Sequence, residues 1–545
     1  MIQKKRFFLN AVALTATSLL MRAVGVAFNV YLSAKIGAAG MGLYSLIMSV
    51  YTFAVTFATS GINLAVTRVI SEEIGKQNAA GVRRAMRSSV LYSLCFGGAA
   101  CVLLFFFAEP LGTYCLSDSR TVSSLKLLSV TLPFIALSSV MNGYFTAVRR
   151  VVKNAAITIA EQAVKISLTV MLLNLFVPKG LEYACLALVG GACISEGGSF
   201  FLSWLLYRLD RRKHLAKIGS QNEVSGVTGR ILRISLPIAL SAYVRSGLLT
   251  VEHILIPIGL RKFGALGDDA LASYGIIHGM VMPVILFPAA FLSAFSGLII
   301  PELSEFHVKG NKTAINSAVR RVFQITMLFA IGVSGIFICF SKELGFALYQ
   351  SEEAGRYIRV IAALIPVMYL DTMVDSMLKG LDQQVASMRY NIMDVSLCVI
   401  MVYTLLPIGG IWAYVAIIFI SELFNASLSI GRLLSVTGVQ VKFCRWALQP
   451  IFCILGATSL SQILFGVLGI HFSYSSTSLF VHITVTTLCY LAFLKLTGGL
   501  SKEDIAWFRS IFSLKGSPKT PEITDGDAGR LQSRTRRTVS GKSEG

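Results

Sequence analysis

The chain of 545 residues is 54% hydrophobic and only 14% charged, whereas about a quarter of the residues in a soluble domain are charged. This composition excludes an ordinary soluble protein and predicts a polytopic membrane protein. The formal net charge of +21 would favour nucleic-acid binding in a soluble chain. Here most Lys and Arg residues lie in short connections between apolar segments, the pattern that sets membrane orientation. We therefore expect no nucleic-acid partner.

Apolar segments long enough to cross a bilayer follow one another along the chain. At about 1.5 Å of rise per residue, roughly 20 helical residues cross a hydrocarbon core of about 30 Å. The segments that reach this length predict an all-α polytopic membrane protein with 14 transmembrane helices. They are residues 9–36, 44–70, 88–108, 123–147, 154–177, 183–207, 231–258, 271–300, 319–341, 357–380, 389–408, 410–432, 446–470 and 478–497.

The connections between these segments differ in basic residues, and this difference predicts the orientation of the chain. One side carries few, such as Lys179 and Lys342, and the other carries many. The positive-inside rule places the basic side in the cytoplasm, and an even number of spans places both termini there. We expect a multi-pass protein of a bacterial cytoplasmic membrane. The basic connections contain Lys76, Arg83, Arg84, Arg87, Arg149, Arg150, Lys153, Arg208, Arg211, Arg212, Lys213, Lys217, Lys309, Lys312, Arg320 and Arg321.

Short motifs recur in the two halves of the chain and indicate an internal repeat. Three pairs carry it: Arg83-Arg84 with Arg320-Arg321, Leu111-Gly112 with Leu344-Gly345, and Ile194-Ser195-Glu196 with Ile420-Ser421-Glu422. Because a six-helix unit has an even number of spans, both copies have the same orientation. This arrangement is typical of transporters with a substrate site between the halves.

The predicted organisation is two pseudo-symmetric six-helix lobes followed by two extra helices. The lobes are residues 1–207 and 231–432, joined by a cytoplasmic linker of residues 208–230. Residues 433–497 contain helices 13 and 14. Residues 498–545 are rich in Ser, Thr, Gly, Pro and Arg, a composition that predicts a disordered, basic cytoplasmic tail.

Charged residues inside the spans mark the place where a substrate would bind. Arg22 lies near the middle of the first span, where a charge costs about 2.5–3.5 kcal/mol unless it faces water or a buried partner. Arg245 and Glu252 lie seven residues apart on one helical face, and Asp371 lies in the tenth span. We expect these four side chains to line an aqueous cavity. For Arg22 the alternative is a snorkelling or helix-bridging role.

Five other charged residues in the spans fit either ion coupling or helix packing. Glu161 and Lys165 are four residues apart, the spacing of an intrahelical ion pair. Glu196 and Glu422 occupy matching places in the two halves, which suits symmetric packing as well as function. Asp375 lies towards the cytoplasmic end of its span, where water can reach it.

No feature of the sequence predicts catalysis or a cofactor. The cysteines are mostly single and within apolar segments, without a CxxC motif or clustered histidines, so we expect neither a metal site nor disulfides. GxSxG and GKS occur only at Gly541-Lys542-Ser543-Glu544-Gly545, in the polar tail and without the preceding apolar strand that a hydrolase or a P-loop requires. We predict a protein that is not an enzyme and that uses an ion gradient or the membrane potential.

Motifs distributed over residues 1–497 resemble those of one family of membrane proteins. They include Met21-Arg22-Ala23-Val24-Gly25, Gly42-Leu43-Tyr44, Ser71-Glu72-Glu73, Asn142-Gly143-Tyr144-Phe145 and Pro301-Glu302-Leu303-Ser304-Glu305. Together they resemble the stage V sporulation protein B group of polysaccharide-biosynthesis membrane proteins. That group belongs with the lipid II and O-antigen flippases to a superfamily of multidrug and oligosaccharide-lipid exporters.

The resemblance implies two six-helix lobes around a central cavity and two extra helices. It also implies transport of an undecaprenyl-diphosphate-linked sugar for peptidoglycan or polysaccharide synthesis, and it maps the arginine that engages the diphosphate onto Arg22. We therefore expect a flippase whose partners are a lipid-linked sugar diphosphate and membrane lipids. Cell-wall synthesis enzymes are further candidate partners.

Two other functions stay open at this point. A drug or cation antiporter of the same superfamily would have a more acidic and aromatic cavity with fewer arginines. A non-transporting scaffold would recruit wall enzymes through its basic tail. Arg22 and Arg245 favour the flippase, because guanidinium groups bind phosphate oxygens. Glu252 and Asp371 then either bind a coupling cation or balance the arginines.

Overall fold

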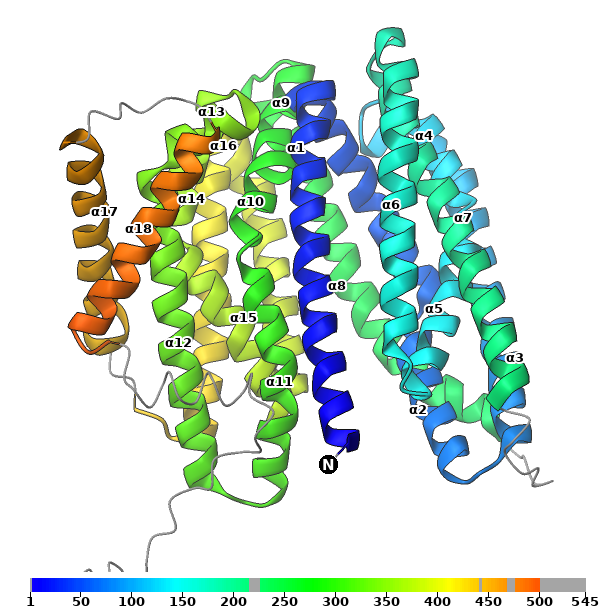
Figure 1. The fold of residues 1–545 in the computed structure, drawn as a ribbon. Helices are drawn as coiled ribbons and strands as arrows, with labels where there is room; N and C mark the ends of the chain where they lie inside the picture. The colour runs from blue at the N-terminus through cyan, green and yellow to red at the C-terminus, as the bar shows by residue number, and fades with distance from the viewer. Residues whose placement is uncertain (1, 215–225, 441–443, 468–475, 500–545) are drawn as a thin grey trace, which may run out of the picture. The chain divides into compact units, whose positions relative to one another are not determined.

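The computed structural model describes residues 2–214, 226–440, 444–467 and 476–499, and these residues are almost entirely helical (Figure 1). Residues 13–499 form one unit, and the description below concerns that unit. The predicted tail from residue 500 and the linker residues 215–225 lie outside the described residues. The predicted all-α polytopic fold is confirmed.

The helices of the first half run from α1 to α7. They are α1 (Ile2–Thr59), α2 (Ile62–Gly75), α3 (Ala79–Pro110), α4 (Arg120–Ser129), α5 (Leu132–Ala147), α6 (Val151–Phe176) and α7 (Leu181–His214). The second half contains α8 (Val227–Phe263), α9 (Gly267–Tyr274), α10 (Met282–Leu286), α11 (Ala289–Val308), α12 (Lys312–Cys339), α13 (Ser341–Tyr349), α14 (Glu352–Ala362), α15 (Ile365–Gly380) and α16 (Gln384–Thr437). The last helices are α17 (Gln449–Val467) and α18 (Ser476–Leu496), which pack against α12 and each other (Figure 1).

By length and composition, 11 of the described helices can cross a membrane, or up to 13 if each bent helix pair is one span. Two glycines affect this number. Gly37 (φ 69°) interrupts α1 between the predicted spans 9–36 and 44–70, and Gly410 (φ 57°) interrupts α16 between the predicted spans 389–408 and 410–432. Both have left-handed backbones that glycine adopts without strain. The number of 14 spans stays a prediction.

The backbone of the first half recurs in the second half. The left-handed residues Gln77, Ser117 and Arg149 match the left-handed residues Gly310, Gln350 and Asp382. Each pair is 233 residues apart (310 − 77, 350 − 117 and 382 − 149). Asn78 and Asn311 likewise cap the first turns of α3 and α12.

The spans that follow also bend at matching places. The pair α4 and α5 bends by 43°, and the pair α14 and α15 bends by 57°. Pro133 and Pro366 begin the second helix of each pair, where proline fits the first turn of a helix. The bends make two broken helices out of spans that the sequence predicted as continuous.

The offset of 233 residues between the matching positions of the two halves corrects one detail of the predicted repeat. It pairs Arg87 with Arg320, one helical turn away from the expected match of Arg83-Arg84 with Arg320-Arg321. The predicted match of Leu111-Gly112 with Leu344-Gly345 keeps the same offset. The boundaries of the two lobes stay a prediction.

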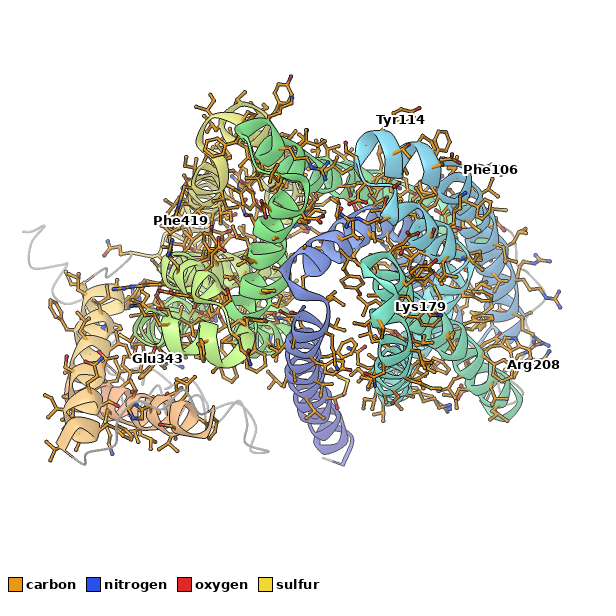
Figure 2. All side chains as sticks on the ribbon, turned by 90° about the horizontal axis from the view of Figure 1, so that it is seen from above. Phe106, Tyr114, Lys179, Arg208, Glu343 and Phe419 are labelled. Atoms are coloured by element: carbon orange, nitrogen blue, oxygen red, sulfur yellow. The ribbon has the colours of Figure 1, made fainter. Side chains whose placement is uncertain are left out.

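The ends of the helices separate a basic end from an opposite end. The turns after α2, α5 and α11 lie at one end together with the start of α8, and we call this the basic end because most of the basic connections lie there (Figure 1). Large apolar side chains such as Phe106 (73% exposed) point outward from the bundle (Figure 2). Such a surface suits lipid rather than water.

Helix α8 packs against both halves. At the basic end Val227 and Ile231 are buried in the hydrophobic core formed by α2, α3 and α5. The rest of α8 packs against α16. The two halves are therefore connected through one long helix.

A close approach of two glycines joins α1 to the π-helical turn Gly275–Val281, which lies between α9 and α10. A Cβ atom on Gly275 would meet the carbonyl oxygen of Ala38 and the backbone nitrogen of Gly42. A Cβ atom on Gly42 would meet the carbonyl oxygen of Leu271. Since the neighbours are backbone atoms, a side chain at either position forces the two segments apart.

We expect Gly275→Ala to lower the stability of the protein by about 1–3 kcal/mol, because overpacking displaces backbone. The measurement is the thermal unfolding midpoint of the purified protein in detergent. The matched control is Gly98→Ala in α3, where a Cβ atom meets nothing within 4 Å. The control should raise the midpoint, since Ala is the better helix former. Equal midpoints for the two variants would contradict the close approach.

Candidate functional site

The second half contains a cluster of carboxylates inside the predicted spans 357–380, 389–408 and 410–432. We call Asp371, Asp394 and Glu422, from α15 and the two parts of α16, the carboxylate cluster. The Ser421 hydroxyl donates to Asp394 at 2.7 Å, and the Asn425 amide donates to Asp371 at 3.0 Å. Asp371 is buried, whereas Asp394 and Glu422 are half-buried. The three carboxylates are close enough to influence one another electrostatically.

Arg245 and Glu252 of α8 lie beside this cluster. The charges of both side chains act on Asp394, which therefore connects α8 with α16 electrostatically. Of the four predicted cavity residues, Arg245, Glu252 and Asp371 thus each lie near Asp394. Sequence reasoning missed Asp394, although a single acid inside the apolar span 389–408 was a usable signal.

Asp375 is hydrogen-bonded to the neighbouring helix. Its carboxylate accepts hydrogen bonds from the Ser387 hydroxyl at 2.7 Å and from the Asn391 amide at 3.4 Å, both at the start of α16. Asp375 therefore holds α15 and α16 together at the basic end. Of the two predicted roles, ion coupling or helix packing, these hydrogen bonds favour packing.

The first half holds a second polar group, formed by α6 and α7. Ser199 donates to Glu161 at 2.7 Å, and Glu161 and Lys165 both influence Glu196. The structure shows no ion pair between Glu161 and Lys165, so the predicted intrahelical pair is not formed. Glu161 is used instead to join α6 to α7.

Arg22 stands apart from both groups. Its side chain is exposed on α1. Among the described residues, no hydrogen bond or ion pair engages it. The structure therefore does not bring Arg22 together with Arg245, Glu252 or Asp371.

Polar contacts connect the two halves at both ends of the bundle. At the basic end Arg230 of α8 binds Glu72 and Glu73 of α2, with 2.8 Å between its Nη1 and the Glu73 Oε1. At the opposite end Arg120 binds Asp118 at 2.7 Å and Asp268 at 2.8 Å. The partners are far apart in sequence, and sequence reasoning did not find them.

Further hydrogen bonds join α1 to α8 between these ends. Thr56 contacts Ser246 at 3.3 Å, and Thr250 donates to the Ser49 carbonyl at 3.1 Å. The Tyr243 hydroxyl contacts Ser60. In the part of the chain that the structure describes, no group of three His, Cys, Asp or Glu side chains is arranged to hold a metal ion. The arrangement is one of two halves with polar inner faces and contacts at both ends.

Comparison with known proteins identifies the family. The model of the family described as "Polysaccharide biosynthesis protein" matches residues 8–307. This chain belongs to the polysaccharide biosynthesis protein family. A second family model, MatE, matches residues 261–405.

Relatives of this chain include two proteins of Bacillus subtilis (strain 168). Stage V sporulation protein B is 23% identical over 455 residues, covering 82% of this chain and 87% of the relative. Lipid II flippase MurJ is 23% identical over 400 residues, covering 68% of this chain and 72% of the relative. The resemblance expected from the motifs is confirmed.

Two solved structures share the fold. The inward closed conformation of a lipid II flippase MurJ has a TM-score of 0.63 at 14% identity and covers 90% of this chain and 98% of the MurJ chain. The inward-facing conformation of a multidrug resistance MATE family transporter has a TM-score of 0.59 at 14% identity and covers 78% of this chain and 100% of that chain.

We expect Arg230→Ala to lower the thermal unfolding midpoint, because it leaves the buried Glu73 without its guanidinium partner. The cost should be about 1–3 kcal/mol, less than for a fully buried pair because Arg230 is one-third exposed. The measurement is thermal unfolding in detergent.

The matched control is Arg233→Ala, one turn along α8, at an exposed position that makes no ion pair with the described residues. It should leave the midpoint nearly unchanged. If Arg233→Ala and Arg230→Ala had the same effect, the contact between Arg230 and α2 would not contribute to stability.

Proposed function

We propose that this protein is a flippase that moves an undecaprenyl-diphosphate-linked sugar across the bacterial cytoplasmic membrane by alternating access. The names of its relatives, among them a lipid II flippase and a sporulation protein, support a lipid-linked wall precursor as substrate. The basic end faces the cytoplasm under this proposal, in accordance with the positive-inside rule. Both termini then also lie in the cytoplasm.

The observation that carries this proposal is the exposure of Arg22 on α1, near the middle of the predicted span 9–36. An arginine at that depth is costly unless an aqueous cavity or an anion accompanies it. No acid accompanies Arg22 among the described side chains, so an external anion is the simplest partner. The planar guanidinium group binds phosphate oxygens with two parallel hydrogen bonds.

The contacts between the halves support alternating access. The ion pair between Arg120 and Asp268, at the end opposite the basic end, is largely exposed. Exposed ion pairs contribute little net stability, so this pair can break and re-form as the halves move. The carboxylate cluster and Glu252 either bind a coupling cation or balance Arg245, while Glu161, Lys165 and Glu196 serve ion coupling or packing.

A drug or cation antiporter is the second candidate function. The observation that favours it is the carboxylate cluster itself, because Asp371, Asp394 and Glu422 with Glu252 outnumber the nearby Arg245. Such an acidic site would attract a cationic substrate. Arg22 and the lipid II flippase among the relatives favour the lipid-linked anion.

We expect Arg22→Ala to abolish transfer of a labelled lipid-linked disaccharide diphosphate in proteoliposomes, and Arg22→Lys to restore only part of it. Lysine keeps the charge but not the planar fork. Arg356→Ala, at an exposed position on α14, is the control and should transport normally. A cationic dye serves as comparison substrate. Normal transfer by Arg22→Ala, or dye transport without lipid transfer in the parent protein, would contradict the proposal.

We expect a disulfide across the halves to stop transport. The hydroxyl oxygens of Thr56 in α1 and Ser246 in α8 lie 3.3 Å apart, so cysteines at both positions can approach disulfide geometry. Ser246 follows Pro237 in α8, on the part of the helix that moves with the second half. Oxidation of Thr56→Cys/Ser246→Cys should abolish transfer, and reduction should restore it.

The control for this crosslink is Thr146→Cys/Asn154→Cys within the first half, where the side chains lie 3.4 Å apart. Its oxidation should leave transfer unchanged. Full transport by the oxidised Thr56/Ser246 variant would show that α1 and α8 need not separate.

A further inference from the structure

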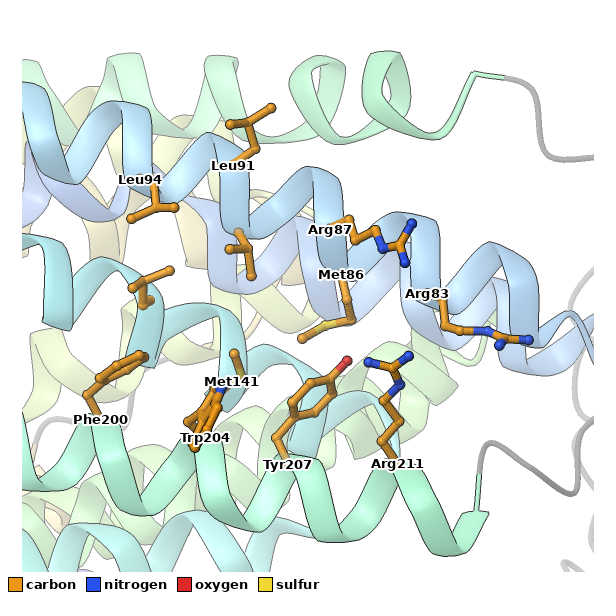
Figure 3. Close-up of a pocket in the computed structure, with 12 residues that line it drawn as sticks. Arg83, Met86, Arg87, Leu91, Leu94, Met141, Phe200, Trp204, Tyr207 and Arg211 are labelled. Carbon is orange, nitrogen blue, oxygen red and sulfur yellow. The ribbon is translucent and has the colours of Figure 1, made fainter.

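A groove opens between α3 and α7 in the first half, near the basic end (Figure 3). Its volume is about 390 Å³. Helix α5 packs against both α3 and α7 and contributes Leu137 and Met141 to the groove. None of the predicted cavity residues lines it, so the groove is separate from the polar groups of the two inner faces.

The groove has an apolar wall and a basic rim. Leu91 (64% exposed) and Leu94 (46% exposed) line it from α3, opposite Phe200 and Trp204 of α7. At the rim Arg87 and Arg211 extend from opposite sides, and the Tyr207 hydroxyl points to the same place (Figure 3). The shape and chemistry match a molecule with a negative head and an apolar chain.

The two rim arginines differ from Arg150, Lys153 and Arg230, which lie at the same end. Arg150 and Lys153 bind the buried Asp210, and Arg230 binds Glu72 and Glu73. Within the described part of the chain, no ion pair engages Arg87 or Arg211. Their charges are therefore available to an anion from outside the protein.

The position of Trp204 indicates how deep the groove lies in the membrane. The guanidinium of Arg208 stacks 3.9 Å from the centre of the Trp204 ring, and Arg208 points outward from α7 (Figure 2). A tryptophan beside an arginine at a helix end is typical of the headgroup level of a bilayer. The rim then lies among headgroups and the apolar wall in hydrocarbon.

The equivalent place in the second half is filled by the chain itself. The register of the repeat matches the groove residue Val90 with Phe323 of α12. Phe323 packs against Trp446, with 5.9 Å between the ring centres, and Trp446 is buried. In the second half Trp446 covers the surface that corresponds to the groove. In the first half this surface stays open.

We propose that this groove binds an anionic phospholipid of the cytoplasmic leaflet, with the phosphate between Arg87 and Arg211 and one acyl chain along Leu91, Leu94 and Trp204. Basic pockets between membrane helices on the cytoplasmic side bind such headgroups. The proposal rests on the orientation given under the proposed function. A lipid held here stays in its own leaflet and is not the transported substrate.

The test uses Trp204 as the reporter. Trp412→Phe, Trp446→Phe and Trp507→Phe leave Trp204 as the only tryptophan. The protein is reconstituted with phosphatidylglycerol or phosphatidylcholine carrying bromine on the acyl chain, which quenches nearby tryptophan. At low mole fraction, brominated phosphatidylglycerol should quench Trp204 more strongly than brominated phosphatidylcholine does. Its affinity for the groove should be higher than that of phosphatidylcholine by about fivefold for each arginine.

Arg87→Gln/Arg211→Gln should remove the preference for phosphatidylglycerol. The control variant Arg320→Gln/Arg389→Gln removes the same charge from exposed positions in the second half. It should keep the preference for phosphatidylglycerol. Equal quenching by both lipids in the parent protein, or equal loss in both double variants, would overturn the proposal. Displacement of the brominated lipid by stoichiometric lipid-linked sugar diphosphate would also overturn it and would make the groove a substrate site. The readout needs no transport, so it is independent of the flippase proposal.

Discussion

A charged or polar group inside hydrocarbon needs a partner or water, and this constraint orders the whole bundle. The buried and half-buried acids accept hydrogen bonds from small polar residues on neighbouring helical segments. Ser199 donates to Glu161, Ser421 donates to Asp394 and Asn425 donates to Asp371. Each of these bonds fixes the rotation of one helix against another. The polar residues therefore determine which helix faces point inward, while apolar residues such as Phe106 are left to face lipid.

The two halves share a backbone but differ in charge. In the first half Lys165 accompanies Glu161 and Glu196, so the acids there are partly balanced. In the second half Arg245 is the one basic residue of the described chain whose charge acts on the acids of the carboxylate cluster, through Asp394. Duplication followed by such divergence gives two inner faces with different affinities for ions. That asymmetry suits a carrier whose substrate has a negative head and whose coupling ion is positive.

The helical segments were predictable because an apolar run of about 20 residues is a local signal. The repeat was predictable from paired motifs, although the register of Arg320 was wrong by one turn. The bends at Pro133 and Pro366 lie inside apolar runs and leave no trace in hydropathy. Partners such as Arg230 and Glu73 lie 157 residues apart, and no spacing rule connects them. The site was therefore predicted as a set of charged residues but not as a set of contacts.

The packing of α8 limits how the halves can move. The predicted boundary at residue 231 places Val227 in the linker and Ile231 in the second lobe, yet both are buried in the core of the first half. A rocking motion must therefore bend α8 or pull its first turns out of that core. Moving these two buried aliphatic side chains out of the core costs several kcal/mol. Bending at a proline costs less, because a proline already lacks one helical hydrogen bond. Pro237 lies between the turns that pack on the first half and the residues near Asp394. Bending at Pro237 is thus the less costly route, and the first turns of α8 belong mechanically with α2 and α3.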